Sequence, residues 1–290
     1  MSHRDRVGVI GVGLMGHGIA RNLQRAGYPL SFLEHPGNQP AEDLVSAGAT
    51  PLKSAGEVAR HSDIVILCVT GSPQVKAVLF ESGGVLEGLR PGTIVIDCST
   101  ALPSSTAEVA RRVNEAGGRF MDAAMTRTPK EAEEGRLNLI VGAPDALFSE
   151  TLPLLQSFAE TITHAGGVGA GHTLKLVHNF VSLGFSAVLS EAVAASRKAG
   201  IDDESLLSVL GNGGGGGVIL ERLRPYIERN DPSGFRFSIA NANKDVGYYR
   251  AMLEDLKSAR AIADTVGELY GSIDDQDATV PELIRLLQTH

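Results

Sequence analysis

Apolar residues in the first half of the chain gather in short runs, and most of these runs are rich in β-branched residues. Between the runs, apolar residues recur every three or four positions, which is the spacing of an amphipathic helix. The runs span residues 7–11, 30–33, 64–69, 93–98, 120–125 and 137–141. Strands that alternate with helices in this way are typical of an α/β fold, so we expect a doubly wound parallel sheet with helices on both faces.

The second half of the chain shows no such alternation. Residues 174–198 carry apolar side chains on almost every face. A helix of this length spans about 40 Å, and its apolar character predicts the buried spine of a helical domain. Further helix-like segments are 203–210, 218–229, 244–256, 258–270 and 280–287. We therefore predict two domains, residues 1–164 with the sheet and residues 165–290 all-α, the second beginning with the long interdomain helix.

Five consecutive glycines, Gly213 to Gly217, lie between two of the predicted helices. Glycine holds a helix poorly because its backbone loses the most conformational freedom. The run is either a flexible hinge or a place where the backbone passes close to a ligand or a partner chain.

Composition and charge exclude several classes of function. The chain has 26 Lys and Arg against 34 Asp and Glu, and its net charge of -8 argues against nucleic acid or a membrane surface as the main partner. Cys68 and Cys98 are too few for a disulfide framework or a four-cysteine zinc site, and we expect no metal. The N-terminus shows no signal-peptide pattern, and no uninterrupted apolar stretch reaches membrane-spanning length. We expect a soluble, cytoplasmic protein.

A glycine-rich turn follows the first predicted strand. The sequence Gly11-Val-Gly13-Leu14-Met15-Gly16 leads directly into a helical pattern. In a dinucleotide-binding turn, the first glycine makes the turn, the second lets the backbone approach a pyrophosphate, and the third lets the helix pack closely on the strand. The helix N-terminus adds N–H donors and positive potential. This stretch therefore predicts a dinucleotide cofactor.

The ends of three later strands are expected to border that cofactor. The second strand ends in Glu34, about twenty residues beyond the glycines, where a carboxylate would bind the ribose 2′-hydroxyl and repel the phosphate of NADP. We therefore expect NAD; the alternative is a solvated charge at a strand end. Val69 and Thr70 follow one strand and Thr100 follows the next, and parallel strands direct their carboxyl ends at the ligand. For Thr100 the alternative is a cap of the helix that begins near Pro103, and the two roles are compatible.

A polar loop, Thr126-Arg127-Thr128, follows the strand at 120–125. An arginine at the ligand-facing end of a buried strand could hold a carboxylate, sulfonate or phosphate with two parallel hydrogen bonds. The alternative is a surface arginine paired with one of the glutamates between Glu131 and Glu134, a run that we interpret as a solvated helix face.

Lys175 and Asn179 lie four positions apart near the start of the long apolar helix, so they share one face. A lysine and an amide are costly to bury without polar partners, and a substrate oxygen is one such partner. The alternative is a lysine that reaches the surface beside an asparagine bonded to backbone. Lys244, later in the chain, could reach the same cleft or lie on the surface.

These separated motifs resemble the β-hydroxyacid dehydrogenase family, the relatives of 3-hydroxyisobutyrate dehydrogenase and tartronate semialdehyde reductase. The resemblance covers nearly the whole chain and rests on Gly11 to Gly16 with Ala20, Asn22 and Leu23, on Asp97 to Thr100, on Gly167 to Gly171 with Lys175 and Asn179, and on Lys244-Asp245. It implies a Rossmann domain, an interdomain helix and an all-α domain that commonly forms homodimers or homotetramers.

The same resemblance implies an activity and roles for single residues. The activity is hydride transfer between NAD and a small hydroxy acid or the corresponding semialdehyde. Lys175 would be the catalytic acid/base and Asn179 a ligand of the substrate or of the lysine. Thr100 and Lys244 would lie near the nicotinamide.

One departure from the family concerns the substrate loop. The family usually has Ser-Gly-Gly after an Asp-Ala-Pro-Val strand, whereas this chain has Asp122-Ala-Ala-Met and then Thr126-Arg127-Thr128. The loop is similar to that of the sulfolactaldehyde reductase branch, which also has an arginine and a threonine there, so Arg127 is expected to hold a distal anionic group. His178, where many relatives have asparagine, is either a pocket residue or a core histidine bonded to backbone.

Two other functions are compatible with the same scaffold. An imine reductase is similar to this family but usually carries another residue at the lysine position. A catalytically silent cofactor-binding or oligomerisation module, as in chromatin-associated relatives, has lost the lysine. Lys175 counts against both.

Overall fold

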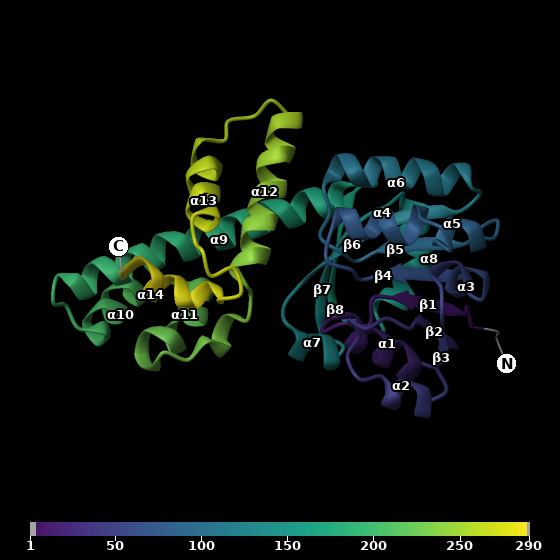
Figure 1. Ribbon diagram of the computed structural model, residues 1–290, viewed down its shortest axis with the longest axis horizontal. Helices are drawn as coiled ribbons and strands as arrows, with labels where there is room; N and C mark the ends of the chain where they lie inside the picture. Colours follow the sequence, from purple (N-terminus) through teal and green to yellow (C-terminus); the bar gives the residue numbers. More distant parts are fainter. Residues whose placement is uncertain (1–3, 289–290) are drawn as a thin grey trace. The chain divides into compact units, whose positions relative to one another are not determined.

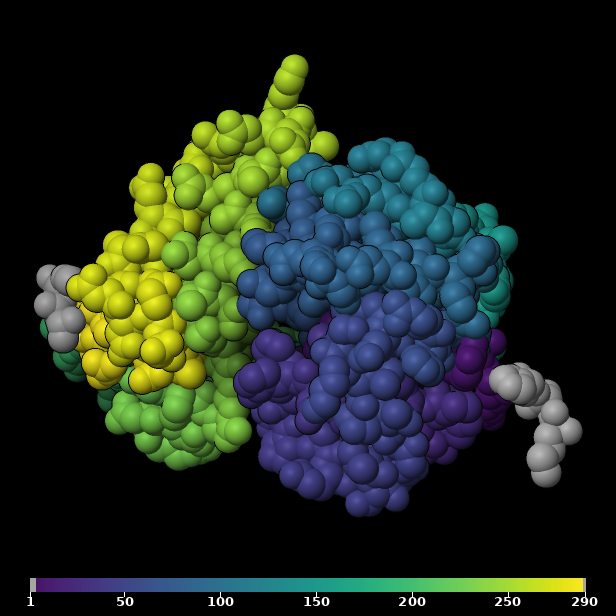
Figure 2. Space-filling view, turned by 45° about the vertical axis from the view of Figure 1, so that its right-hand side comes forward, coloured from purple at the N-terminus to yellow at the C-terminus, as the bar shows by residue number. Residues whose placement is uncertain are grey.

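The computed structural model describes residues 4–288. Its internal contacts divide the chain into two units, one that ends at Lys175 and one that begins at Leu176. The division falls inside helix α9 (Ala170–Lys198), whereas the sequence predicts a boundary between residues 164 and 165. The first unit is purple to teal in Figures 1 and 2, and the second is green to yellow.

The first unit is built on one eight-stranded sheet. The strands, in chain order, are β1 (Val7–Ile10), β2 (Leu30–Leu33), β3 (Thr50–Leu52), β4 (Ile64–Leu67), β5 (Ile94–Asp97), β6 (Arg119–Thr126), β7 (Leu137–Gly142) and β8 (Ala159–Gly166). Their order across the sheet is β3-β2-β1-β4-β5-β6-β7-β8. Every neighbouring pair is parallel except β6 and β7, which are antiparallel. The predicted doubly wound sheet is confirmed. It was predicted to be parallel throughout, and the antiparallel pair β6 and β7 is the exception.

Helices cover both faces of the sheet (Figure 1). One apolar core lies between the sheet and α1 (Gly16–Arg25), α2 (Glu42–Ser46), α7 (Pro129–Glu133) and α8 (Asp145–Leu155). A second core lies on the other face, beneath α3 (Ala55–Arg60), α4 (Ser72–Phe80), α5 (Val85–Gly88) and α6 (Pro103–Glu115). Strands β1, β4 and β5 are buried along their whole length because both faces are covered.

The second unit is helical, as predicted. It contains the remainder of α9, then α10 (Asp203–Asn212), α11 (Val218–Arg229), α12 (Ile239–Asp255), α13 (Ala261–Gly271) and α14 (Leu283–Gln288), with short 3-10 turns at Pro232–Phe235 and Val280–Glu282. Buried apolar residues of α9 pack against α12 and α13 in one cluster and against α10 and α11 in another. The hydroxyl of Tyr270 donates to the carbonyl oxygen of Leu183 at 2.9 Å, which ties α13 to α9.

Within the described residues, α9 is the one helix that is long and apolar enough to cross a membrane by length and composition, and 44% of its most apolar window is buried inside the protein. The glycine run lies in the turn between α10 and α11, and Gly217 has a φ of 136°.

Candidate active site

The glycine-rich turn has the backbone that a dinucleotide-binding turn requires. It follows β1, whose neighbours on the two sides are β2 and β4, so the strand order reverses there. Gly11 has a φ of 98°, and a Cβ at this position would lie 2.2 Å from the carbonyl oxygen of Cys68. A Cβ at Gly16 would lie 1.9 Å from the carbonyl oxygen of Gly11. Neither position has room for a side chain.

Gly13 differs from these two glycines because it is not crowded. The nearest atom to a Cβ at Gly13 would be the carbonyl oxygen of Gly37, at 4.0 Å. The backbone is therefore open to close approach by a ligand, at the amino end of α1, where free N–H groups favour an anion. Met15 packs against the core, and Leu14 is exposed. The turn fits the pyrophosphate of a dinucleotide.

Glu34 lies directly after β2, at the carboxyl end of that strand. Its backbone N–H donates to the carbonyl oxygen of Leu52 at 2.8 Å, and its carboxylate pairs with the ammonium of Lys53. Both side chains are exposed. The ammonium offsets part of the carboxylate's charge, so the repulsion that a 2′-phosphate would meet at Glu34 is weakened.

Hydrogen bonds join the loops that follow β4 and β5. The N–H of Val69 donates to Ser99 Oγ at 3.1 Å, and the N–H of Ser99 donates to Asp97 Oδ1 at 2.9 Å. Thr70 and Thr100 continue these two loops. Because β4 and β5 are parallel neighbours, both threonines lie at the carboxyl edge of the sheet, the edge of the glycine turn.

Asp122, in β6, binds the start of the helix that carries Lys175. Its Oδ1 accepts the N–H of Gly169 at 2.6 Å, and its Oδ2 accepts the N–H of His172 at 2.8 Å. Burial raises the pKa of this carboxyl, although His172 and the two N–H groups act in the opposite direction. Asp122 thus accepts hydrogen bonds from N–H groups at the start of α9 that have no partner within the helix. This role of Asp122 was not predicted from the sequence, in which it stands out only as a lone carboxylate in an apolar strand.

His172 adds a second contact at the same place. Its Nδ1 lies 2.7 Å from the hydroxyl of Thr106, which donates to the carbonyl oxygen of Leu102 at 3.0 Å. The network therefore assigns the ring hydrogen to Nδ1. His172 is fully buried, and its Nε2 lies 3.9 Å from Asp97 Oδ2, which is too far for a hydrogen bond. These contacts join α6 and the end of β5 to α9.

In the second unit, Asp245 gathers three of the residues that the sequence singled out. Asn179 donates from Nδ2 to Asp245 Oδ2 at 2.6 Å, and its Oδ1 lies 3.0 Å from Nδ1 of His178. Lys244 Nζ lies 3.3 Å from Asp245 Oδ1, an ion pair without hydrogen-bond geometry. Asp245 is 2% exposed. A buried carboxylate therefore fixes the amide of Asn179, which lies one helical turn after Lys175.

The substrate loop predicted from sequence makes mainly local contacts. The guanidinium of Arg127 binds the carboxylate of Glu160 in β8 and the carbonyl oxygen of Arg136. Thr128 caps α7, since its N–H donates to Glu131 Oε2 at 3.0 Å and its hydroxyl to the same oxygen at 2.5 Å. Thr126 is the half-buried last residue of β6. Arg127 therefore has a glutamate partner, but that glutamate comes from β8 and not from the Glu131 to Glu134 run.

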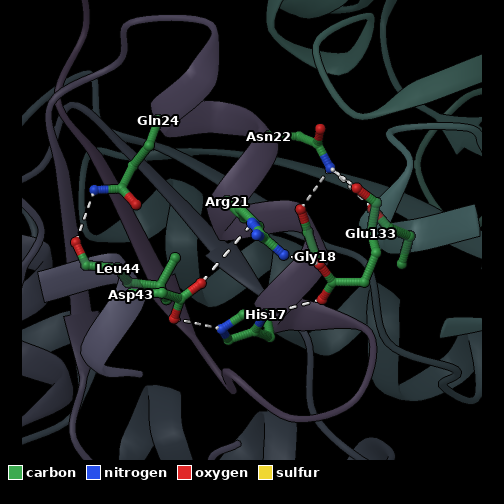
Figure 3. A network of polar contacts seen from close by, with 9 residues as sticks. His17, Gly18, Arg21, Asn22, Gln24, Asp43, Leu44 and Glu133 are labelled. Atoms are coloured by element: carbon green, nitrogen blue, oxygen red, sulfur yellow. Dashed lines mark hydrogen bonds and ion pairs between the residues drawn. The ribbon is translucent and has the colours of Figure 1, made fainter. Parts of the chain in front are cut away.

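That run is not only a solvated helix face, which corrects the sequence interpretation. Glu133 Oε1 lies 3.0 Å from His17 Nδ1, and Glu133 Oε2 accepts a hydrogen bond from Arg21 at 2.9 Å (Figure 3). Helix α7 follows the loop at Thr126–Thr128, so these contacts tie the loop region to α1. No local sequence pattern marked His17, because its partner Glu133 lies 116 positions away.

Among the described residues, no three His, Cys, Asp or Glu side chains gather as a metal-binding group.

Two family models match most of the chain. Residues 6–167 match the NAD binding domain of 6-phosphogluconate dehydrogenase, and residues 169–287 match the NAD-binding domain of NADP-dependent 3-hydroxyisobutyrate dehydrogenase. The first model alone covers more than half of the chain. The two matches meet just before α9 begins.

Two curated proteins are similar over most of their length. The chain is 35% identical over 260 residues to 2-hydroxy-3-oxopropionate reductase of Escherichia coli (strain K12), which is 89% of this chain and 85% of that protein. It is 32% identical over 251 residues to 2-(hydroxymethyl)glutarate dehydrogenase of Eubacterium barkeri, which is 85% of this chain and 82% of that protein.

The fold is also that of a solved structure. A 3-hydroxyisobutyrate dehydrogenase from Mycobacterium tuberculosis superposes with a TM-score of 0.87, covering 99% of this chain and 100% of that chain at 24% identity. At this identity the likeness concerns the fold.

Proposed function

The chain belongs to the β-hydroxyacid dehydrogenase family, and from this premise we propose that it interconverts a small 3-hydroxy acid and the corresponding semialdehyde with NAD(H), using Lys175 as acid/base. The family makes it an NAD(P)-dependent oxidoreductase. The observation that carries the proposal is the fixed position of the Lys175 segment. Asp122 holds the start of α9, and one turn after Lys175 the buried Asp245 holds Asn179.

The proposed chemistry needs little from the protein beyond binding, orientation and one proton. Bound NAD(H) supplies or takes up the hydride. In reduction, Lys175 as an ammonium donates a proton to the carbonyl oxygen of the semialdehyde. In oxidation, neutral Lys175 accepts the proton of the hydroxyl group. Asn179 orients the substrate or the lysine. Because Asp245 already holds its amide, Asn179 loses little side-chain freedom when it does so.

For the cofactor, we propose that NAD is preferred over NADP. Glu34 supports this, because a carboxylate directly after β2 can accept a hydrogen bond from the ribose 2′-hydroxyl of NAD. Gly11, Gly13, Leu14, Met15 and Gly16 would hold the pyrophosphate side, and Val69, Thr70, Thr100 and Lys244 the nicotinamide side. Lys53 beside Glu34 predicts a modest preference rather than an absolute one.

For the substrate, we propose that Arg127 holds a distal anionic group and that Thr126, Thr128 and His178 also contribute to substrate binding. Glu160 supports this indirectly, since the guanidinium already accommodates a carboxylate. A substrate anion would have to replace Glu160, so binding at Arg127 exchanges one ion pair for another. Carboxylate and sulfonate both fit an arginine, and sulfolactaldehyde is therefore an alternative substrate.

The experiment that tests the proposal compares Lys175→Ala with the unaltered protein on semialdehydes that carry a distal carboxylate, sulfonate or phosphate. We expect kcat to fall by roughly 10²- to 10⁴-fold, as for loss of a general acid/base, with NADH binding unchanged in a fluorescence titration. The matched control is Lys198→Ala, because Lys198 is an exposed lysine in the last turn of the same helix. Full turnover by Lys175→Ala would contradict the assignment. Absence of turnover by the unaltered protein, despite NADH binding, would favour the catalytically silent module.

We further propose a homodimer or homotetramer in the cytoplasm. Leu174, Val181 and Val188 follow one another at seven-residue intervals on α9 and are 42%, 62% and 62% exposed. Residues seven apart lie on one helix face. A row of exposed apolar side chains on a core helix supports burial against a second copy of the chain.

A further inference from the structure

Four charged side chains form a closed cluster beside the dinucleotide turn, shown in Figure 3. His17 Nε2 lies 3.0 Å from Asp43 Oδ1, and His17 Nδ1 lies 3.0 Å from Glu133 Oε1. Arg21 donates to Glu133 Oε2 at 2.9 Å and lies 3.8 Å from Asp43 Oδ2. Each cation thus faces both carboxylates. We call these four residues the His17 cluster.

The His17 cluster joins three helices that border the cofactor and substrate loops. His17 lies in the first turn of α1, directly after Gly16. Asp43 lies in α2, which follows the loop that begins with Glu34. Glu133 is the last residue of α7, which follows the loop with Arg127. The two loops therefore share one attachment point, at the helix of the glycine turn.

Close packing supports the attachment of α7 to α1. Asn22 Nδ2 donates to the carbonyl oxygens of Gly18 at 2.8 Å and Ala132 at 2.9 Å. A Cβ at Gly18 would lie 2.5 Å from the carbonyl carbon of Ala132. The backbones of α1 and α7 are therefore in contact. A change in the charged contacts of Glu133 alters how α7 is held against α1.

The geometry requires a protonated imidazole. A carboxylate only accepts hydrogen bonds, and a neutral imidazole has a single N–H, so only the imidazolium can donate to both Asp43 and Glu133. Burial of His17 and the positive end of α1 both oppose that charge. The hydrogen bonds that His17 donates to Glu133 and Asp43 outweigh the burial, and the pKa of His17 is raised above its ordinary value of 6.5.

We propose that His17 is a proton-dependent positioning residue that holds the ribose-side loop and the substrate-side loop against the dinucleotide turn. The charged groups that face it are Arg21 from its own helix, Asp43 from α2 and Glu133 from α7. When His17 loses its proton, one ring nitrogen presents a lone pair to a carboxylate. The hydrogen bond between that nitrogen and Asp43 or Glu133 is then lost. The role of the Asp43 contact on the ribose side rests on the family's cofactor chemistry. The role of the Glu133 contact on the substrate side rests on the proposed function.

The direction of the pH effect follows from the raised pKa. A histidine whose folded pKa is raised contributes its full stabilisation below its ordinary pKa and loses it as the pH rises through the folded value. The cluster is therefore complete near pH 6 and loosened at alkaline pH. Arg21 stays charged and keeps its contacts with both carboxylates, so the loops loosen without separating.

The first measurement is hydrogen–deuterium exchange of the unaltered protein and His17→Gln. Near pH 6, we expect faster exchange in His17→Gln at residues 34–46 and 126–136; near pH 9, we expect the two proteins to converge. The matched control is His61→Gln, since His61 is exposed and, within residues 4–288, its ring bonds the carbonyl oxygen of Glu57. Equal exchange near pH 6, or an unchanged difference near pH 9, would overturn the proposal. Neither result depends on a known substrate.

The second measurement separates the contact with Asp43 from the contact with Glu133. Asp43→Asn should raise the dissociation constant of NADH about three- to tenfold near pH 6, the usual net effect of one hydrogen bond. Glu133→Gln should raise the KM for the carbonyl substrate by a similar factor and leave kcat unchanged. His17→Lys, which stays charged through this range, should keep the tight NADH binding near pH 9 that the unaltered protein loses. Equal effects of both variants on both constants would indicate a merely structural cluster.

Discussion

Arg127 combines an unusual backbone with the position that we propose for binding of the substrate's anionic group. Its φ is 80°, and the other positive φ values at non-glycine residues in the described chain belong to Asn230 and Lys257. Asn230 ends α11 in the left-handed region that asparagine tolerates. Placing Arg127 in this left-handed region costs about 1 kcal/mol or more of folding free energy, because its Cβ crowds the backbone. The family resemblance places glycines in this loop, so Arg127 occupies a glycine-like backbone position.

This backbone predicts different effects on stability for two substitutions at Arg127. Arg127→Gly removes the strain of about 1 kcal/mol and loses a part-exposed ion pair worth about 0–1 kcal/mol, so the free energy of unfolding should stay the same or rise slightly. Arg127→Ala loses the pair and keeps the strain, and should be less stable than the glycine variant by about 1 kcal/mol. Urea unfolding measures both. Equal stability of the two variants would show that the backbone carries no strain, and an unchanged KM for anionic substrates would remove Arg127 from the site.

At this scale, the sequence predicted the residues that act through their own backbone. Gly11 and Gly16 need no partner to be recognised, because the motif itself implies a crowded turn. The contacts that join distant residues were missed, even where a partner such as Asn179 was singled out. Asn179 and Asp245 are 66 positions apart, and their hydrogen bond depends on how α9 and α12 pack, which local spacing does not encode.

At the scale of elements, the sequence predicted the central strands and missed the edges. Strands β1, β4 and β5 are continuous apolar runs because both their faces are buried. Strands β3 and β8 lie at the two ends of the sheet and are mostly exposed or half-buried, so their residues carry no such run. The antiparallel pairing of β6 with β7 was also missed, because direction is a property of the connection between strands.

Asp122 shows how one side chain positions an element. Asp122→Asn keeps the shape but replaces one acceptor oxygen with an NH₂ group, which leaves an N–H of Gly169 or His172 without its partner. We expect a loss of about 1–3 kcal/mol in the free energy of unfolding. Loosening the first turn of α9 also displaces Lys175, so kcat should fall while NADH binding holds. Thermal unfolding and steady-state kinetics measure the two effects.

The pH dependence of that variant gives an independent check. A carboxyl whose folded pKa is raised binds its proton more tightly in the folded protein, so the unaltered protein should lose stability as the pH rises through that pKa. Asp122→Asn cannot titrate and should lack this slope. The control is Asp145→Asn, at the start of α8, since the Asp145 side chain is 99% exposed. A slope that survives in Asp122→Asn would assign it to another group.

Several large apolar side chains are exposed on the described part of the chain, and three of them form a row on α9. A net charge of -8 disfavours association between copies through unspecific contacts, yet α9 keeps its row of exposed apolar residues, Leu174, Val181 and Val188. Exposed single apolar residues are ordinary, but a row at heptad spacing on a helix is the pattern of a helix–helix interface. The surface thus favours a specific, limited assembly.

Val181→Glu tests that assembly. A glutamate in the centre of the row would have to be buried without a partner, which is costly, so we expect the unaltered oligomer to dissociate into smaller species at micromolar concentration. The control is Val209→Glu on α10, because Val209 is 71% exposed and lies outside the row, and both variants change the net charge equally. Light scattering coupled to size exclusion measures the mass. A monomeric unaltered protein, or equal masses for both variants, would contradict the interface. If the dissociated Val181→Glu keeps its turnover, the active site is complete within one chain.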